Sequence, residues 1–140
     1  MGLEMNSNCL LVVEDDPRIA SLVCHVAAEA GFKAYAATGP EAITQAYASV
    51  QPDVIVLDVF MPDMDGLEVL QFLRQQFSTV RIVIISGSDS TSRRMTENLG
   101  KALGFSIEAN ISKPFQIAEL RALFERIRDS LDEAREALRA

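Results

Sequence analysis

Short runs of apolar residues alternate along the chain with longer segments in which apolar residues recur every three or four positions. The short runs are typical of strands buried on both faces, and the longer segments are typical of amphipathic helices. Five runs and five helical segments follow one another, without internal repeats or low-complexity tracts. The expected strands are residues 9–13, 33–37, 54–57, 80–85 and 107–111.

Local signals at the start of each helical segment support this assignment. Asp16-Pro17 supplies an N-cap and a first-turn proline, Gly39-Pro40 opens the second helix, and Asp65 is the expected N-cap of the third. The polar stretch SDSTS precedes the fourth helix, and the fifth is expected to start at Lys113-Pro114-Phe115. This alternation predicts an α/β fold with helices on both faces of a five-stranded parallel sheet. Right-handed crossovers favour a doubly wound sheet in the flavodoxin-like order 2-1-3-4-5.

Polar and charged residues gather where the expected strands end. Glu14 and Asp15 follow the first strand, Asp58 follows the third, Ser86 the fourth and Lys113 the fifth. Because ligands of such sheets bind beyond the carboxyl ends of the strands, these side chains are expected in one pocket. Neighbouring carboxylates repel one another, and a hard divalent cation such as Mg²⁺ is the usual compensation. A carboxylate beside a cation, a lysine and a hydroxyl is suited to accept a phosphoryl group, and Asp58 is the predicted acceptor.

The composition restricts the class of protein and its partners. The 140-residue chain has a net charge of -7, which argues against direct binding to nucleic acid or to an anionic membrane. No apolar run approaches the roughly 20 residues that a membrane span needs, and the start MGLEMNSN lacks the pattern of a signal peptide. Cys9 and Cys24 are too few for a disulfide framework and are expected as buried thiols. These observations predict a cytoplasmic protein.

Four motifs, in the order VVEDDP, LDVFMPDMDG, IISG and SKPF, resemble the receiver domain of two-component response regulators over about residues 9–127. The resemblance implies that Asp58 is phosphorylated by a sensor histidine kinase or a phosphotransfer protein, with Mg²⁺ as the cofactor. It also implies that the chain is not an enzyme. It would phosphorylate itself from phosphohistidine or a small phosphodonor and lose the phosphoryl group slowly.

The resemblance further implies a set of magnesium ligands. Glu14 and Asp15 would form the acidic pair, in which Asp15 binds the ion directly and Glu14 binds it through water. Asp58 and the backbone carbonyl of Phe60 would be the remaining protein ligands.

The resemblance implies that two more residues bind the phosphoryl group. At one further position the chain departs from the pattern of the family. Ser86 would donate a hydrogen bond to a phosphoryl oxygen, and Lys113 would pair with the phosphoryl group. The family has a cis peptide bond at the position of Lys113-Pro114. Many receivers carry an aromatic residue where this chain has Asn110, so the route of the signal from Ser86 is expected to differ here. The stretch LGKALGFSIEANISKPF also resembles receivers attached to cyclic-di-GMP phosphodiesterase outputs.

The expected domain organisation is an N-terminal tail at residues 1–8, a receiver domain at 9–128 and an extension of the last helix at 129–140. In the extension, Leu131, Ala134 and Leu138 continue the helical apolar spacing beyond the expected end of the domain. An output domain or a dimer partner would cover this apolar seam. Fraying in solvent is the alternative.

Two other classes of protein, and a receiver that works without phosphorylation, compete with this interpretation. A phosphatase of the haloacid dehalogenase type needs a second aspartate at the position of Phe60, which offers no base to activate water. A flavodoxin-like flavin binder needs a hydroxyl- and glycine-rich loop after the first strand, where Glu14-Asp15-Asp16 would repel a phosphate. A receiver that signals without phosphorylation is disfavoured because the residues for the chemistry are present.

Overall fold

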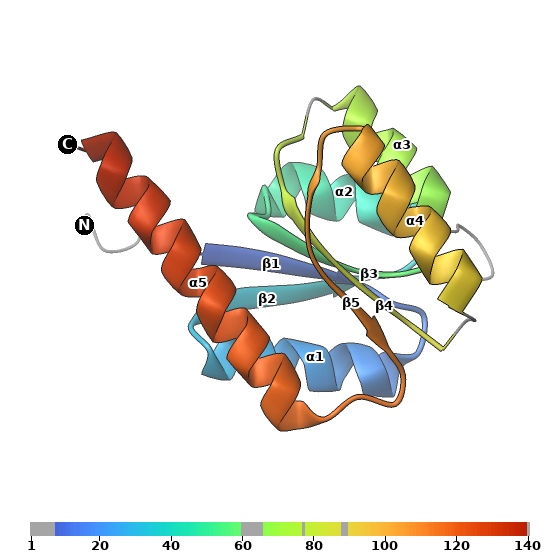
Figure 1. The fold of residues 1–140 in the computed structure, drawn as a ribbon, viewed down its shortest axis with the longest axis horizontal. Coiled ribbons are helices and arrows are strands. Elements are labelled where there is room, and N and C mark those ends of the chain that lie inside the picture. Colours follow the sequence, from blue (N-terminus) through green and yellow to red (C-terminus); the bar gives the residue numbers. More distant parts are fainter. Residues whose placement is uncertain (1–7, 60–65, 77, 88–89, 140) are drawn as a thin grey trace.

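The structure, a computed structural model, describes residues 8–59, 66–76, 78–87 and 90–139 of the 140-residue chain. The expected N-cap Asp65 and the predicted magnesium ligand Phe60 lie outside these residues. Five strands alternate with five helices in the described ranges (Figure 1). In chain order they are β1 (Asn8–Val13), α1 (Pro17–Glu29), β2 (Phe32–Ala37), α2 (Pro40–Val50), β3 (Val54–Asp58), α3 (Gly66–Gln75), β4 (Arg81–Ser86), α4 (Ser90–Ala102), β5 (Ser106–Ser112) and α5 (Ile117–Arg139).

The strands form one parallel sheet in the order β2-β1-β3-β4-β5, which confirms the predicted fold. Successive residues of a strand point to opposite faces, so the inner strands contribute to both layers of the core. Leu10 and Val12 lie in the layer that α1 and α5 cover, and Leu11 and Val13 lie in the layer beneath α2, α3 and α4 (Figure 1). Because β1 and β3 are adjacent inner strands, their carboxyl ends meet at one edge of the sheet.

The first helix begins as predicted, whereas the last begins later than predicted. The Asp16 side chain accepts a hydrogen bond from the Arg18 N–H at 2.9 Å, so Asp16 is the N-cap of α1. The last helix begins at Ile117 and not at Lys113-Pro114. The reason is that the Lys113 N–H donates to the Ser86 carbonyl oxygen at 3.0 Å, which extends the pairing of β5 with β4.

Polar contacts tie the C-terminal half of α5 to the sheet. The Arg81 guanidinium, at the start of β4, donates to Ser130 Oγ at 2.7 Å. Arg135 Nη2 lies 3.2 Å from Asp53 Oδ1, just before β3, and the same guanidinium donates to the Asn8 side chain. The helix therefore remains in contact with the amino ends of the strands as far as Arg135.

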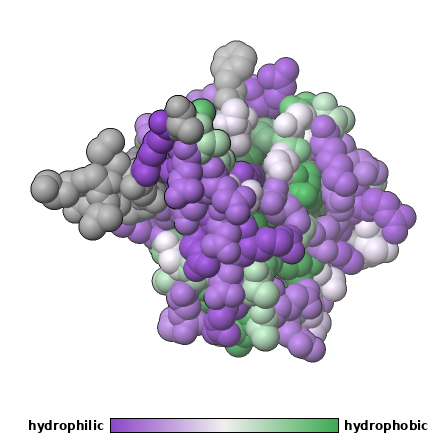
Figure 2. All heavy atoms as spheres, turned by 60° about the vertical axis from the view of Figure 1, so that its left-hand side comes forward, coloured by the Kyte–Doolittle hydropathy of each residue, from purple (hydrophilic) through white to green (hydrophobic). Residues whose placement is uncertain are grey.

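The apolar seam of the last helix is covered only in part. Leu131 packs against the core layer beneath α1 and α5, whereas Ala134 is exposed and Leu138 is 89% exposed. Figure 2 brings the side with the end of α5 forward and shows a mostly hydrophilic surface with apolar patches between polar side chains. Within the described ranges, no helix combines the length and the apolar character that crossing a bilayer requires. The domain boundaries at 1–8, 9–128 and 129–140 stay predictions.

Replacement of Arg135 by alanine should lower the free energy of unfolding by about 1–2 kcal/mol, because Asp53 and Asn8 lose a partly buried charged partner. Urea titration followed by circular dichroism measures this change. Arg126→Ala, at an exposed position of the same helix, is the matched control and should change the stability by less than about 0.5 kcal/mol. Equal stability of the two variants would show that Arg135 does not anchor the end of α5.

Candidate functional site

The carboxyl edge of the sheet gathers side chains from four strands. Glu14 follows β1, Asp58 ends β3, Ser86 ends β4 and Lys113 follows β5. Carboxylate oxygens of Glu14, Asp15 and Asp58 lie within 4.8 Å of one another. Glu14 and Asp58 are only 1% and 2% exposed, whereas Asp15 is exposed. The structure thus brings the side chains of Glu14, Asp15, Asp58 and Lys113 together, and it places Ser86 at the end of the strand between β3 and β5.

Lys113 is the counter-ion of the two buried carboxylates. Its Nζ lies 2.5 Å from Glu14 Oε1 and 3.3 Å from Asp58 Oδ2. The hydrogen bond from its backbone N–H to Ser86 fixes the lysine at the end of β5, next to β4. The Lys113-Pro114 peptide bond is cis, as the family resemblance implies. One ammonium group therefore faces two carboxylates that have little contact with water.

This single ammonium does not compensate both carboxylates. Burial, together with a hydrogen bond to the Asp58 carboxyl group, raises the pKa of Glu14 to about 7, although the hydrogen bond with Lys113 acts in the opposite direction. Burial lowers the pKa of Lys113, but the hydrogen bond to Glu14 and the charge of Asp58 outweigh burial and hold this pKa above its ordinary value. The lysine therefore stays charged near neutral pH, and Glu14 keeps its proton to a higher pH than an exposed glutamate does.

Two groups that hold Glu14 in place were not predicted from the sequence. The Asp16 N–H donates to Glu14 Oε2 at 3.2 Å, and Thr38 Oγ1 donates to the Glu14 carbonyl oxygen at 3.0 Å. Thr38 directly follows β2, the neighbour of β1, so a hydroxyl residue at that strand end was the available signal. Asp16 therefore supports the site through its backbone and caps α1 through its side chain.

The donor set of the cluster fits a hard divalent cation. Glu14, Asp15 and Asp58 offer only carboxylate oxygens, which Mg²⁺ prefers over nitrogen or sulfur ligands. Burial, together with the neighbouring Asp58 carboxyl group, raises the pKa of Glu14, and a bound cation would favour the charged form of both carboxylates. These three residues are therefore the ones that would hold the ion. The predicted backbone ligand Phe60 lies outside the described residues.

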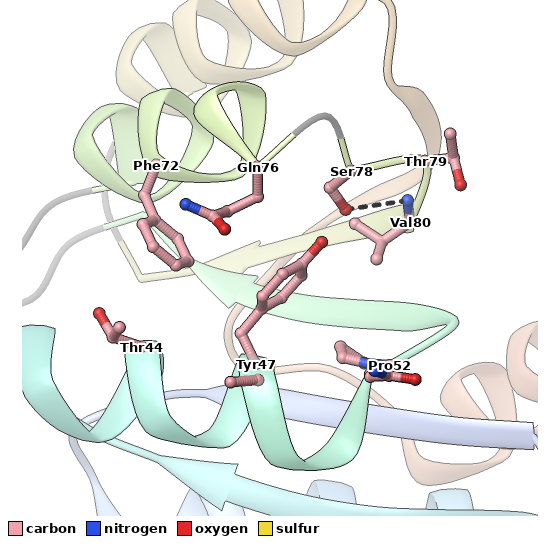
Figure 3. A pocket seen from close by; sticks show the side chains of 10 residues that line it. Thr44, Tyr47, Pro52, Phe72, Gln76, Ser78, Thr79 and Val80 are labelled. Carbon is pink, nitrogen blue, oxygen red and sulfur yellow. Dashed lines mark hydrogen bonds between the residues drawn. The ribbon is translucent and has the colours of Figure 1, made fainter.

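A pocket of about 410 Å³ lies between α2 and α3, away from the acidic cluster (Figure 3). The rings of Tyr47 and Phe72 line it and pack edge to face, with their centroids 5.6 Å apart. Pro52 and Val80 also line it and precede β3 and β4, so the pocket lies at the amino edge of the sheet, opposite Asp58. None of the described residues that line it is charged, which leaves the carboxyl edge as the candidate site for chemistry.

A doubly wound sheet with a buried aspartate, an acidic pair and a lysine at its carboxyl edge defines the receiver class of signalling domains. The chain belongs to the family described as the response regulator receiver domain, which matches residues 10–125. Members of this family act in two-component systems and are characteristically phosphorylated on an aspartate.

Relatives of known sequence are consistent with this family. The alkaline phosphatase synthesis transcriptional regulatory protein PhoP of Bacillus subtilis is 32% identical over 115 residues, which are 81% of this chain and 45% of PhoP. The transcriptional regulatory protein TrcR of Mycobacterium tuberculosis is 33% identical over 135 residues, which are 93% of this chain and 50% of TrcR. The chain thus spans about half the length of the curated relatives that it matches.

Solved structures show the same fold. A response regulator from Colwellia psychrerythraea is 27% identical with a TM-score of 0.76, and the match covers 88% of this chain and 98% of that one. The receiver domain of the Francisella response regulator 1452 is 30% identical with a TM-score of 0.68, covering 86% of this chain and 99% of that one. The finer resemblance of residues 99–115 to receivers with cyclic-di-GMP phosphodiesterase outputs stays a prediction.

The raised pKa of Glu14 predicts a stability that falls as the pH rises. Between about pH 4.5 and 7 the folded chain holds a proton on Glu14 that the unfolded chain has released, so each pH unit should lower the free energy of unfolding by up to about 1.4 kcal/mol. Urea titrations at several pH values, in the presence of a chelator, measure this slope. In Glu14→Gln the slope over this window should be smaller than in the wild type. Equal slopes would contradict the assignment of the proton to Glu14.

Proposed function

We propose that Asp58 is the phosphoacceptor of this receiver domain, supplied by a sensor histidine kinase, a phosphotransfer protein or a small phosphodonor. The observation that carries the proposal is the position of Asp58. It ends an inner strand, is 2% exposed, and has its Oδ2 3.3 Å from Lys113 Nζ beside the Glu14–Asp15 pair. A carboxylate in this setting can act as a nucleophile while cationic groups stabilise the incoming charge.

The transfer itself requires little of the protein beyond positioning and charge. An Asp58 carboxylate oxygen attacks the phosphorus atom of the donor, and a new O–P bond forms as the P–N bond of phosphohistidine breaks. The imidazole leaves with the electron pair of that bond. Bound Mg²⁺ would compensate the negative charge that the carboxylates and the phosphoryl oxygens share. Glu14, Asp15 and Asp58 are its proposed side-chain ligands, and the backbone of Phe60 is a further proposed ligand.

Lys113 and Ser86 are proposed to bind the phosphoryl group and so to respond to phosphorylation. In the unphosphorylated chain the lysine already pairs with Glu14 and Asp58, so it can transfer these contacts to phosphoryl oxygens without entering the site from outside. Ser86 is fully buried at the end of the neighbouring strand, where its hydroxyl would donate to the same group. Phe60 stands where a phosphatase would carry its second aspartate, which supports slow loss of the phosphoryl group.

The end of α5 is the proposed connection to an output domain or a second chain. Arg135 ties the helix to Asp53, and Leu138, one turn further, is 89% exposed. A helix that is anchored up to this point and exposes a leucine beyond it suits the attachment of a partner. Since the curated relatives extend well beyond the matched region, an output domain on the same chain is the proposal that fits their length.

Incubation with a small phosphodonor and Mg²⁺ should add one phosphate to the intact mass of the chain, and a chelator should prevent the addition. Asp58→Asn should show no adduct because the amide is a poor nucleophile. The exposed Asp129→Asn is the matched control and should behave as the wild type. A phosphate adduct on Asp58→Asn equal to that of the wild type would contradict the assignment.

Replacement of Lys113 by alanine should separate phosphorylation from its structural effect. The variant should still acquire a phosphate, more slowly, but the change in amide exchange on phosphorylation between Ser86 and Phe124 should disappear. The reason is that alanine has no ammonium group that could pair with the phosphoryl oxygens. Hydrogen exchange measured by mass spectrometry tests this, with the exposed Lys33→Ala as the control. A wild-type change in exchange in Lys113→Ala would show that the lysine does not transmit the signal.

A further inference from the structure

The side chain of Asn110 joins β5 to α4 by three hydrogen bonds. Asn110 Oδ1 accepts from Arg93 Nη1 at 3.0 Å, and Asn110 Nδ2 donates to the Arg93 carbonyl oxygen at 3.3 Å and to Glu97 Oε1 at 2.7 Å. Lys101 lies 2.7 Å from Glu97 and completes the group. Asn110 thus uses its donor and its acceptor on the same helix, at a position three residues before Lys113.

These polar contacts matter because the apolar attachment of α4 is small, with Leu99 only partly buried against the core. Its buried residues are Thr96 and Gly100, neither of which is a large apolar side chain. In contrast, α3 buries Val69, Leu70 and Leu73. A helix with few buried apolar contacts opens at low free energy, so hydrogen bonds supply a larger share of its attachment.

The C-terminal half of α4 is attached differently from its N-terminal half. A Cβ atom added at Gly100 would come within 2.7 Å of Ile107 Cδ1, so the absence of a side chain lets the helix approach β5 closely. Arg93 and Glu97 lie in the first two turns, which are the part of α4 nearer in sequence to Ser86. Movement at the end of β4 would therefore act first on the half of α4 that Asn110 holds.

The contacts of Asn110 hold α4 but leave one buried polar group of this helix without a hydrogen bond. The Nε–H of Arg93 is buried and has no hydrogen-bond partner among the described residues. A buried donor without a partner raises the free energy of the arrangement that buries it. The attached arrangement of α4 therefore carries a cost that a displaced helix, with Arg93 in water, would not carry.

We propose that Asn110, Arg93 and Glu97 form a polar latch that holds α4 on β5 in the unphosphorylated chain and opens on phosphorylation. The latch rests on the proposed function, because its trigger is the phosphoryl group on Asp58. Lys113 continues the strand that carries Asn110, so its shift toward phosphoryl oxygens would displace the end of β5. Hydrogen bonds weaken steeply with distance and angle, so a small displacement is enough to release α4. The latch thus takes the place of the aromatic residue that many receivers carry here.

Hydrogen exchange of α4 in the unphosphorylated chain tests whether the latch exists. Asn110→Ala should speed amide exchange in residues 90–102 by at least about fivefold. Lys101→Ala removes the other partner of Glu97, leaves the three hydrogen bonds of Asn110 intact, and should stay within about twofold of the wild type. Asn110→Asp keeps the acceptor for Arg93 but cannot donate to Glu97, and should resemble Asn110→Ala. Wild-type exchange in Asn110→Ala and Asn110→Asp would overturn the latch.

Binding of the phosphoryl mimic beryllofluoride with Mg²⁺ tests whether the latch is coupled to Asp58. If the latch opposes the activated arrangement, Asn110→Ala should bind the mimic severalfold more tightly than the wild type, because coupling between two equilibria is reciprocal. Faster exchange of α4 with an unchanged affinity for the mimic would overturn the coupling. If the wild type itself binds no mimic, the proposed function of Asp58 fails, and the exchange of α4 still decides whether the latch exists.

Discussion

The site depends on one constraint, which is that two buried carboxylates share a single ammonium group. Glu14 follows β1 and Asp58 ends the adjacent strand β3, and the Lys113 ammonium contacts both carboxylates. Burial of like charges is unfavourable, and it persists here because the backbones of β1 and β3 are fixed by fully buried apolar neighbours on both faces of the sheet. The apolar core therefore keeps the two carboxylates buried next to each other, although this arrangement alone is unfavourable. The acidic cluster could bind a cation, and Lys113 lies within contact distance of both carboxylates.

The strand that leads to Lys113 lies at the edge of the sheet between two helices of unequal attachment. α5 buries Phe124 and Ile127 completely, and its distal half is tied to the amino ends of the strands. Among the described residues α4 buries no large apolar side chain completely, Leu99 is only partly buried, and hydrogen bonds from Asn110 add to its attachment. A displacement of β5 would therefore be resisted more strongly by α5 than by α4. This asymmetry gives a direction to any movement that begins at the carboxyl edge.

The parts of the molecule that follow from local pattern could be predicted from the sequence, and the parts that depend on distant polar pairs could not. Apolar runs predict the strands, and the parallel alignment of these strands predicts that Asp58 and Lys113 lie at the same edge of the sheet. The pairing of Asp53 with Arg135 joins residues 82 positions apart and leaves no periodic trace in the sequence. The contacts of Asn110 could not be predicted either. The absence of an aromatic ring at this position does not indicate which polar groups the asparagine contacts.

The sparse apolar burial of α4 has a thermodynamic consequence. The heat-capacity change of a conformational transition follows mainly the apolar area that it exposes. The buried residues of α4 are Thr96 and Gly100 and its Leu99 is only partly buried, so the helix itself exposes less apolar area on moving than α3, which buries Val69, Leu70 and Leu73. The enthalpy of displacing α4 should therefore vary less with temperature than the enthalpy of displacing α3.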